Sequence, residues 1–297
     1  MPRAALLSLH ARVAKTAPST WEDPSLAQVW GPRFSAYVVA ARDRAIFTLA
    51  RLPESGATRR VAEDIADRLD AFLAGRKMNY WEAGHALGEA SPNRLRYATL
   101  TGRVLIRWEG ARRPIVWTVP APKTTPREAG LELARRYLHV FGPATPASFA
   151  TWGGIAPAVG SATFDALGDE LTAVRTPVGD AWILSNDESS FRASRRRDRD
   201  GARLLPSGDA FFLLQGADRQ LLVPEAKPRA SLWTSRVWPG AVLLDGEIVG
   251  TWRRAGADLV IETWRALSRQ EREVIEAEAA SLPLPDVGGR IRVRWLA

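Results

Sequence analysis

The 297-residue sequence contains no cysteine. Disulfide scaffolds, thiolate zinc sites, iron–sulfur clusters and cysteine nucleophiles are therefore excluded together. The chain also has no apolar run of about 18 residues, and its apolar start, Ala4–Leu7, ends at Ser8 and is too short for a signal peptide. We therefore expect neither membrane insertion nor secretion, and the missing thiols fit a reducing cytoplasm.

Recognisable catalytic motifs are missing as well. The glycine loops that bind mononucleotides and dinucleotides are absent, and no serine stands in a nucleophile-elbow pattern. The three histidines, His10, His85 and His139, lack metal-ligand spacing, although Glu89 lies one helical turn after His85. We expect no metal and no cofactor. The hypothesis of a small-molecule enzyme with a tryptophan-lined pocket is supported only by the 12 tryptophans, and ordinary core packing explains these better.

Lysine is scarce, because 37 of the 41 cationic residues are arginine, and the net charge is +8. The planar guanidinium group suits phosphate recognition better than an ammonium group does. Nucleic acid is therefore the leading class of partner. An arginine bias can also reflect genome composition alone, so the position of the charge matters more than its sum.

The positive charge is concentrated between Ser91 and Val140, where ten cations face three acids and leave a charge of +7. A uniform compositional bias would not produce this concentration. The cations are Arg94, Arg96, Arg103, Arg107, Arg112, Arg113, Lys123, Arg127, Arg135 and Arg136, and the acids are Glu109, Glu128 and Glu132.

A second concentration follows Ser189-Ser190 and carries +4 in a polar stretch. Two interpretations stay open: an exposed linker that tracks a nucleic-acid backbone, or a solvated hinge with no partner. Its cations are Arg192, Arg195, Arg196, Arg197, Arg199 and Arg203, against Asp198 and Asp200.

Residues 76–122 show the order of elements of a winged helix. Helices are predicted over 80–87 and 93–100, the second after Ser91-Pro92, and two strands over 103–108 and 114–119. Helix, turn, helix and hairpin within about 40 residues is the winged-helix order. Arg94 and Arg96 would then lie on the helix that enters a major groove, and Arg107, Arg112 and Arg113 at the wing.

Residues 123–188 repeat this plan, with predicted helices over 127–140, 145–152 and 157–167 and a hairpin over 171–184. The two hairpins share an arginine, a glycine and a tryptophan at matching places, which favours internal duplication, although any two hairpins could share a glycine and a tryptophan. The pairs are Arg107 and Arg175, Gly110 and Gly179, and Trp117 and Trp182. The second copy has few basic residues, which is typical of a packing or protein-contact module.

The flanking parts differ from these two. Residues 1–75 contain a helix with an apolar face over 4–13, a strand-like segment around Gly31-Pro32 and helices over 43–52 and 59–74. Residues 189–297 contain short strand-length runs, a hairpin turn at Asp245-Gly246 and a helix over 268–280 that opens with a capping box. The strand-length runs cover 211–214, 220–223, 241–244, 248–252, 258–262 and 290–295.

We therefore predict an α+β fold of tandem winged-helix domains followed by a small carboxy-terminal antiparallel β-barrel. The predicted parts are a first winged-helix region (1–75), a second winged helix (76–122), a third winged helix (123–188) and a linker with the barrel and a terminal helix (189–297).

Several short segments of the sequence, here called phrases, resemble those of a known family. They are Leu9–Val13, Val29–Val39, Leu204–Asp209 and, most specifically, Leu243–Arg254. The chain resembles the winged-helix DNA-binding proteins that include the AlkZ-like and YcaQ-like DNA glycosylases, from Leu6 to about Leu282. The resemblance implies three tandem winged helices and a carboxy-terminal β-barrel that clamp duplex DNA, with excision of bulky or crosslinked alkylated bases.

One departure from the family affects catalysis. In the family a Gln-apolar-Gln or Gln-apolar-Asp motif lies just upstream of the segment that corresponds to Pro2–Leu9, where this chain begins. Either the start codon is assigned too late, or this is a shortened homologue that binds without cleaving. A first winged helix without its opening helices would expose apolar surface, which favours the first explanation. The catalytic residue stays unknown.

Two functions follow: a glycosylase-like repair protein, or a non-catalytic DNA-binding or regulatory protein. Both predict a monomer on double-stranded DNA in the cytoplasm, associated with the nucleoid. The predicted DNA contacts are Arg94, Arg96, Arg103, Arg107, Arg112, Arg113, Arg195, Arg196 and Arg197.

Overall fold

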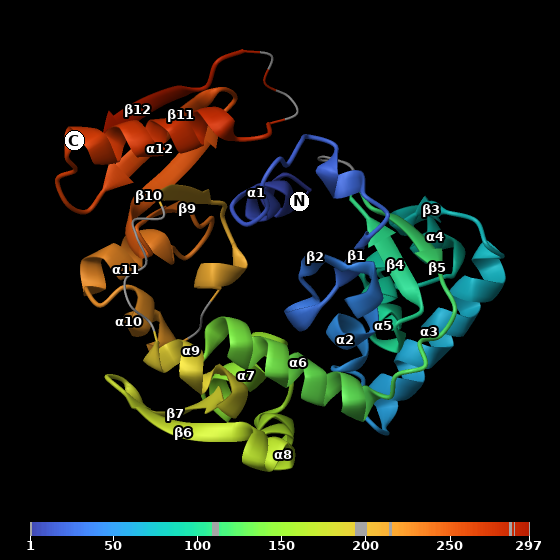
Figure 1. Cartoon of the computed structure of the whole chain (residues 1–297). Helices are drawn as coiled ribbons and strands as arrows, with labels where there is room; N and C mark the ends of the chain where they lie inside the picture. Colours follow the sequence, from blue (N-terminus) through green and yellow to red (C-terminus); the bar gives the residue numbers. More distant parts are fainter. Residues whose placement is uncertain are drawn as a thin grey trace. The chain divides into compact units, whose positions relative to one another are not determined.

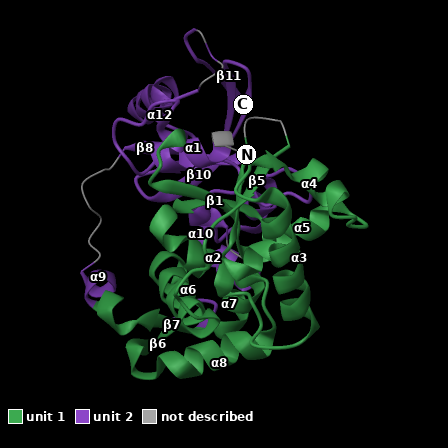
Figure 2. Ribbon diagram, turned by 90° about the vertical axis from the view of Figure 1, so that its right-hand side faces the viewer, with its two compact units in different colours: residues 1–2, 22–175, 180–188 green, residues 3–21, 176–179, 189–297 purple. Residues whose placement is uncertain are grey.

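The computed structural model describes residues 2–108, 113–193, 201–213, 216–284, 287 and 289–296, except the side chains of residues 2 and 3. These residues form helices and several β-sheets, so the predicted α+β class is confirmed (Figure 1). Contacts divide the chain into two units, coloured in Figure 2. Unit 1 comprises residues 1–2, 22–175 and 180–188, and unit 2 comprises residues 3–21, 176–179 and 189–297.

Unit 1 contains a five-stranded antiparallel sheet in the order β2-β1-β4-β5-β3. The hairpin β4–β5, which the sequence predicts, joins the hairpin β1–β2 through β1 and β4, where Gln28 pairs with Ile106. The strands are β1 (Leu26–Trp30), β2 (Ala36–Ala40), β3 (Met78–Asn79), β4 (Val104–Arg107) and β5 (Ile115–Thr118). The helices around them are α2 (Arg44–Leu49), α3 (Ala57–Leu73), α4 (Tyr80–Ala86) and α5 (Leu95–Ala98).

Helix α3 holds this sheet through one apolar stripe. Ile65, Leu69 and Leu73 recur every fourth residue and are fully buried against Val104 and Ile106 of β4. In β4 the buried residues alternate with partly exposed ones, as the period of a strand requires. Beyond Leu73 the chain turns through the left-handed region at residues 74 and 75, so the helix ends near Gly75 as predicted.

The rest of unit 1 repeats the order of three helices and a hairpin. The predicted elements are present. The hairpin turns at Pro177-Val178, however, and these residues directly precede the predicted turn at Gly179-Asp180. An isolated bridge pairs Ala144 with Trp182, at the place in the order of elements where β3 pairs with β5 in the preceding segment. The elements are α6 (Pro126–Phe141), α7 (Pro146–Gly153), α8 (Pro157–Leu167), β6 (Leu171–Thr176), β7 (Gly179–Leu184) and α9 (Glu188–Arg192), the last of which lies at the boundary between the units.

Unit 2 contains a second five-stranded sheet in the order β12-β11-β10-β9-β8. Asp245 and Gly246 both have positive φ values, 50° and 87°, which confirms the predicted hairpin turn between β9 and β10. The strands are β8 (Ala202–Leu205), β9 (Gly240–Leu244), β10 (Glu247–Ala255), β11 (Asp258–Thr263) and β12 (Arg292–Leu296). The helices are α1 (Pro2–His10), α10 (Arg219–Leu222), α11 (Ala226–Leu232) and α12 (Arg269–Ser281).

The observed sheet differs from the predicted antiparallel β-barrel. Among the described residues the sheet is open, because β12 runs parallel to β11 as an edge strand and does not pair with β8. Two predicted strands are also wrong: residues 210–212 form a 3-10 turn and residues 219–222 form α10. The side chain of Asp209 accepts a hydrogen bond from the amide of Phe211 at 2.9 Å, which starts the turn. An apolar run this short fits a helix as well as a strand.

Both faces of the unit 2 sheet are covered. Leu204 and Val242 pack in a cluster with Ile275 of α12, while their neighbours Leu205 and Ala241 pack with Leu232 of α11. Consecutive apolar residues in β8 and β9 point to opposite faces of the sheet and therefore pack against apolar residues on both faces. Leu7 of α1 joins the first cluster, so α1 belongs to unit 2 and not with the remainder of residues 1–75.

The cap of α12 gives a pH prediction. Glu271 accepts hydrogen bonds from Arg265 Nη2 at 2.8 Å and from the Ser268 amide at 2.7 Å, and these lower its pKa to about 2. Since the folded pKa lies below the ordinary value, the stabilisation is present above pH about 4.3 and is lost as the pH falls toward 2. Urea midpoints measured between about pH 5 and about pH 2 should fall less in Glu271→Gln than in wild type.

Arg265→Gln should flatten the same curve, because the Arg265 hydrogen bond contributes most to lowering the pKa. Wild-type pH dependence in Glu271→Gln would contradict this account of the cap.

Candidate nucleic-acid interface

Helix α4 and the helical turn 92–101 meet closely in unit 1. The Asn79 side chain caps α4 by accepting a hydrogen bond from the Trp81 amide at 3.0 Å. Gly84 lies against Pro92, and a β-carbon at Gly84 would stand 2.7 Å from the Pro92 α-carbon. Tyr80 Oη donates to Asn93 Oδ1 at 2.8 Å. These contacts fix the turn that presents Arg94 and Arg96.

Arg94 and Arg96 lie on this turn, as the sequence predicts, but in different environments. Arg94 Nε lies 3.0 Å from Glu89 Oε2, and the Glu89 side chain is only 6% exposed and also pairs with Arg68. Arg96 Nε donates to the carbonyl of Asn93, and its guanidinium lies 5.7 Å from the centre of the Phe34 ring.

Arg103 and Arg107, which flank and end β4, also have acidic partners. Arg103 forms ion pairs with Asp67 and Asp70 of α3, which attach the start of β4 to that helix. Arg107 Nη2 lies 3.6 Å from a carboxylate oxygen of Glu22.

Arg113 precedes β5 and is exposed. Its guanidinium lies 4.4 Å from the centre of the Trp81 ring on α4, which supports the side chain through a cation–π contact. Four other predicted residues, Arg112, Arg195, Arg196 and Arg197, lie outside the described residues.

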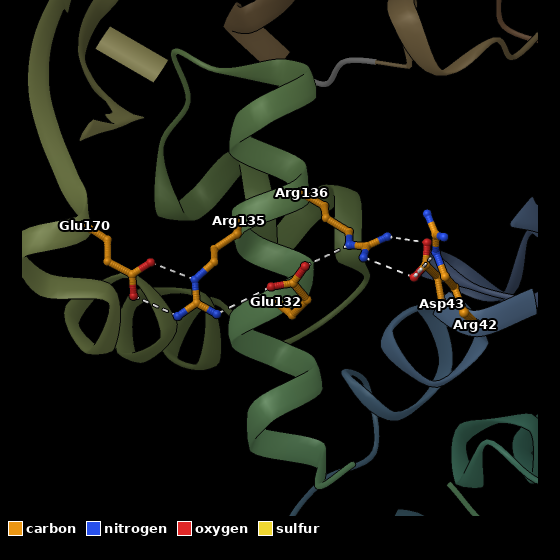
Figure 3. A network of polar contacts seen from close by, with 6 residues as sticks. All are labelled: Arg42, Asp43, Glu132, Arg135, Arg136 and Glu170. Atoms are coloured by element: carbon orange, nitrogen blue, oxygen red, sulfur yellow. Dashed lines mark hydrogen bonds and ion pairs between the residues drawn. The ribbon is translucent and has the colours of Figure 1, made fainter. Parts of the chain in front are cut away.

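Two further arginines of the basic segment form a network on α6 (Figure 3). Arg135 binds both carboxylate oxygens of Glu170, each at 2.7 Å, and lowers the pKa of that glutamate. Arg136 binds Asp43 through both of its terminal nitrogens, and Glu132 contacts both arginines. Asp43 and Glu170 stand far from residue 132 in the sequence, so the network ties three segments of unit 1 together.

The charge interpretation therefore needs a correction. Among the cations between Ser91 and Val140 that the structure describes, five are in ion pairs, and most of their partners lie outside that window. Arg96 and Arg113 are held against aromatic rings, and no ion pair involves Lys123 or Arg127 in the described part of the chain. The cations available to an anionic ligand are fewer than the sum of +7 suggests.

Sequence analysis missed Arg33 and Arg51. Arg51 lies 4.2 Å from the centre of the Phe34 ring, the ring that Arg96 also approaches. Arg33 stands inside the phrase Val29–Val39, which gave a signal, whereas no pattern marks Arg51. Elsewhere, no three histidine, aspartate or glutamate side chains gather to hold a metal in the regions described, and no described helix is long and apolar enough to span a bilayer.

Comparison with known proteins agrees with this architecture. A family model described as "DNA glycosylase AlkZ-like" matches residues 1–283. The chain belongs to the AlkZ-like DNA glycosylase family. This confirms the resemblance seen in the sequence phrases.

Two relatives illustrate the family. The AlkZ-like chain is 26% identical over 271 residues to an "Interstrand DNA cross-link repair glycosylase" of Streptomyces sahachiroi, covering 81% of this chain and 70% of that protein. It also matches the solved structure of Streptomyces sahachiroi DNA glycosylase AlkZ with a TM-score of 0.77 and 20% identity, over 99% of this chain and 89% of that one. The second match shows a common fold.

Proposed function

We propose that this AlkZ-like protein binds double-stranded DNA and excises alkylated or crosslinked bases by hydrolysing the N-glycosidic bond. The observation that carries the proposal is the family match over residues 1–283, together with a relative named for crosslink repair. Hydrolysis of an already labile alkylated nucleotide requires access to the base and a water molecule. The proposal therefore needs no metal and no cofactor.

Tandem winged helices are part of the proposal. The order α3, β3, α4, α5, β4, β5, with β3 pairing to β5, supports a winged helix over 76–122 preceded by α3. The order of α6 to β7, with its Ala144–Trp182 bridge, supports a second copy over 123–188. The hairpin β1–β2 would be the wing of a first module within 1–75, and 189–297 would form the last domain.

Arg96 and Arg113 carry the proposed phosphate contacts on the second module. Arg94 and Arg107 remain predicted contacts. The Arg107–Glu22 pair is exposed and contributes little, so a phosphate can replace that carboxylate, whereas Arg94 also holds the nearly buried Glu89. Arg103, held by two aspartates, mainly anchors β4. Arg112 and Arg195–Arg197 remain predicted contacts.

Replacing Arg113 by alanine should weaken binding to all duplex sequences alike, because a phosphate contact carries no sequence information. The slope of log K against log salt should become shallower by about 0.9, the value for one lost contact. Fluorescence anisotropy with a labelled duplex at several salt concentrations measures both quantities. Arg175→Ala, an exposed arginine on the basic-poor hairpin, is the matched control and should leave the slope unchanged.

Base excision is tested with an alkylated duplex. The protein should generate abasic sites, detected as strand breaks after alkaline treatment, and an unmodified duplex should stay intact. If no abasic sites form at protein concentrations that saturate the duplex, the glycosylase proposal fails.

A second candidate is a non-catalytic DNA-binding protein. It is favoured by the state of two acidic residues with almost fully buried side chains: Asp209 is bound by Arg12 and Ser8, and Glu89 by Arg68 and Arg94. Neither carboxylate is free to activate a water molecule. Salt-dependent duplex binding without abasic sites would support this candidate. Under both candidates we propose a monomer on nucleoid DNA in the cytoplasm.

A further inference from the structure

The turn between β1 and β2 has an unusual backbone. Arg33 and Phe34 both lie in the left-handed region, with φ values of 55° and 54°, and neither is glycine. Such conformations are unfavourable for side-chain-bearing residues and concentrate at ligand sites. The turn 31–35 is therefore held in place by its surroundings at a conformational cost.

Two contacts from other segments hold this turn. Arg51 Nη1 donates to the carbonyl of Gly31 at 2.8 Å. Gly154, at the end of α7, lies so close that a β-carbon there would stand 2.9 Å from Arg33 Cγ and 3.1 Å from its α-carbon. The position of Arg33 is thus fixed from two sides within unit 1.

Three guanidinium groups gather at this turn. Arg51 and Arg96 lie 4.2 Å and 5.7 Å from the centre of the Phe34 ring, and the side chains of Arg33 and Arg51 both interact with Tyr37. Burial raises the pKa of Tyr37 to about 12, although the positive charges of Arg33 and Arg51 act to lower it. The hydroxyl therefore stays protonated and can donate a hydrogen bond.

None of the three arginines has a carboxylate partner among the described residues, unlike Arg68, Arg94, Arg103, Arg135 and Arg136 of the same unit. The Nε atoms of Arg33 and Arg51 are buried without a hydrogen-bond partner. Burial also lowers the pKa of Arg51 to about 10. Like charges that are partly buried together without a counterion leave unmet hydrogen-bonding capacity, which an anion would satisfy.

We propose that Arg33, Arg51 and Arg96 form a phosphate-binding site at the β1–β2 turn, which holds one phosphodiester of the DNA backbone. The planar guanidinium groups match the oxygens of a phosphate, and the aromatic ring of Phe34 keeps two of them in place. The assignment to DNA rests on the proposed function, whereas the affinity for phosphate oxygens does not.

The test compares Arg33→Met and Arg51→Met with Arg76→Met. Arg76 is a matched control, because it also lies over a phenylalanine, Phe72, and also donates to a backbone carbonyl, but follows α3 and lies outside the β1–β2 turn. At about 0.1 M salt, each site variant should bind an undamaged labelled duplex about eightfold more weakly, and its salt slope should be shallower by about 0.9. Arg76→Met should keep the wild-type slope.

Arg51→Lys separates charge from local structure. It keeps the positive charge, so the salt slope should stay near the wild-type value even if the turn loosens. Unchanged salt slopes in Arg33→Met and Arg51→Met would overturn the proposal. A salt slope that becomes as shallow in Arg51→Lys as in Arg51→Met would also overturn it.

A second measurement distinguishes this site from the proposed function. Thermal unfolding is followed with increasing inorganic phosphate at constant ionic strength. Phosphate should raise the Tm of wild type and Arg76→Met more than that of Arg33→Met, because only a bound anion stabilises by mass action. If wild type binds no duplex, the proposed function fails, and a variant-dependent rise in Tm still supports a phosphate site. An equal rise in all the proteins is a general salt effect and would refute the site.

Discussion

Replacing Arg12 by methionine should lower the free energy of unfolding by about 3–5 kcal/mol, because it leaves a buried carboxylate without its charge partner. Asp209 has a side-chain exposure of 0% and accepts hydrogen bonds from both terminal nitrogens of Arg12, at 2.9 Å and 2.7 Å. Ser8 Oγ and the Phe211 amide donate to the same carboxylate. These contacts attach α1 and the residues after it to unit 2.

The matched control is Arg292→Met. Arg292 also binds both oxygens of its carboxylate partner, Asp258, through Nε at 2.7 Å and Nη2 at 2.9 Å, but the Asp258 side chain is 51% exposed. Water can solvate that carboxylate when its partner is removed, so the loss should be much smaller than in Arg12→Met. Urea unfolding curves measure both losses. Equal losses in the two variants would show that burial of Asp209 does not determine the stability of this pair.

Much of the local structure could be predicted from the sequence, because short-range chemistry determines it. Ser268 and Glu271 form the expected capping box of α12, and Asp245-Gly246 forms the expected hairpin turn. The strand predicted at 220–223 is wrong, since an apolar run of this length suits a helix as well as a strand. The barrel was predicted from the number of strands, but strand pairing decides closure, and β12 pairs in parallel at one edge.

The candidate site was less predictable than the fold. A sum of charge over residues 91–140 counts only the acids inside that window, whereas folding brings Glu22, Asp43 and Asp67 to Arg107, Arg136 and Arg103. For the same reason Arg33, Arg51 and Arg96, which come from a turn, the residues after α2 and α5, could not be grouped from sequence spacing.

The phrase Leu243–Arg254, which was the most specific sign of the family, has a structural reason. It contains the tight turn at Asp245-Gly246 and also Gly250, where a β-carbon would stand 2.2 Å from the carbonyl oxygen of Glu262 on β11. The turn and Gly250, which both accept few residue types, therefore lie within the same twelve-residue segment. The phrase is specific because β9, β10 and β11 pack closely, and it says nothing about DNA contacts.

The second large effect expected is on duplex binding. Arg33, Arg51, Arg96 and Arg113 are the four described arginines to which we assign phosphate contacts, and none has a carboxylate partner in the regions described. Arg33, Arg51 and Arg96 share one phosphodiester and Arg113 holds a second. Two contacts predict a slope of log K against log salt of about −1.8, so affinity should fall about 12-fold between about 50 mM and about 200 mM salt. Contacts from Arg112 or Arg195–Arg197 would make the slope steeper.

Anisotropy titrations of an undamaged duplex across this range of salt therefore test the central claim most directly. A slope of about −1.8 or steeper, which becomes shallower by about 0.9 when either contact is removed, by Arg113→Ala or by Arg33→Met, is the result that the account predicts. A wild-type protein that fails to bind at the lowest salt, or whose affinity does not change with salt, would contradict it.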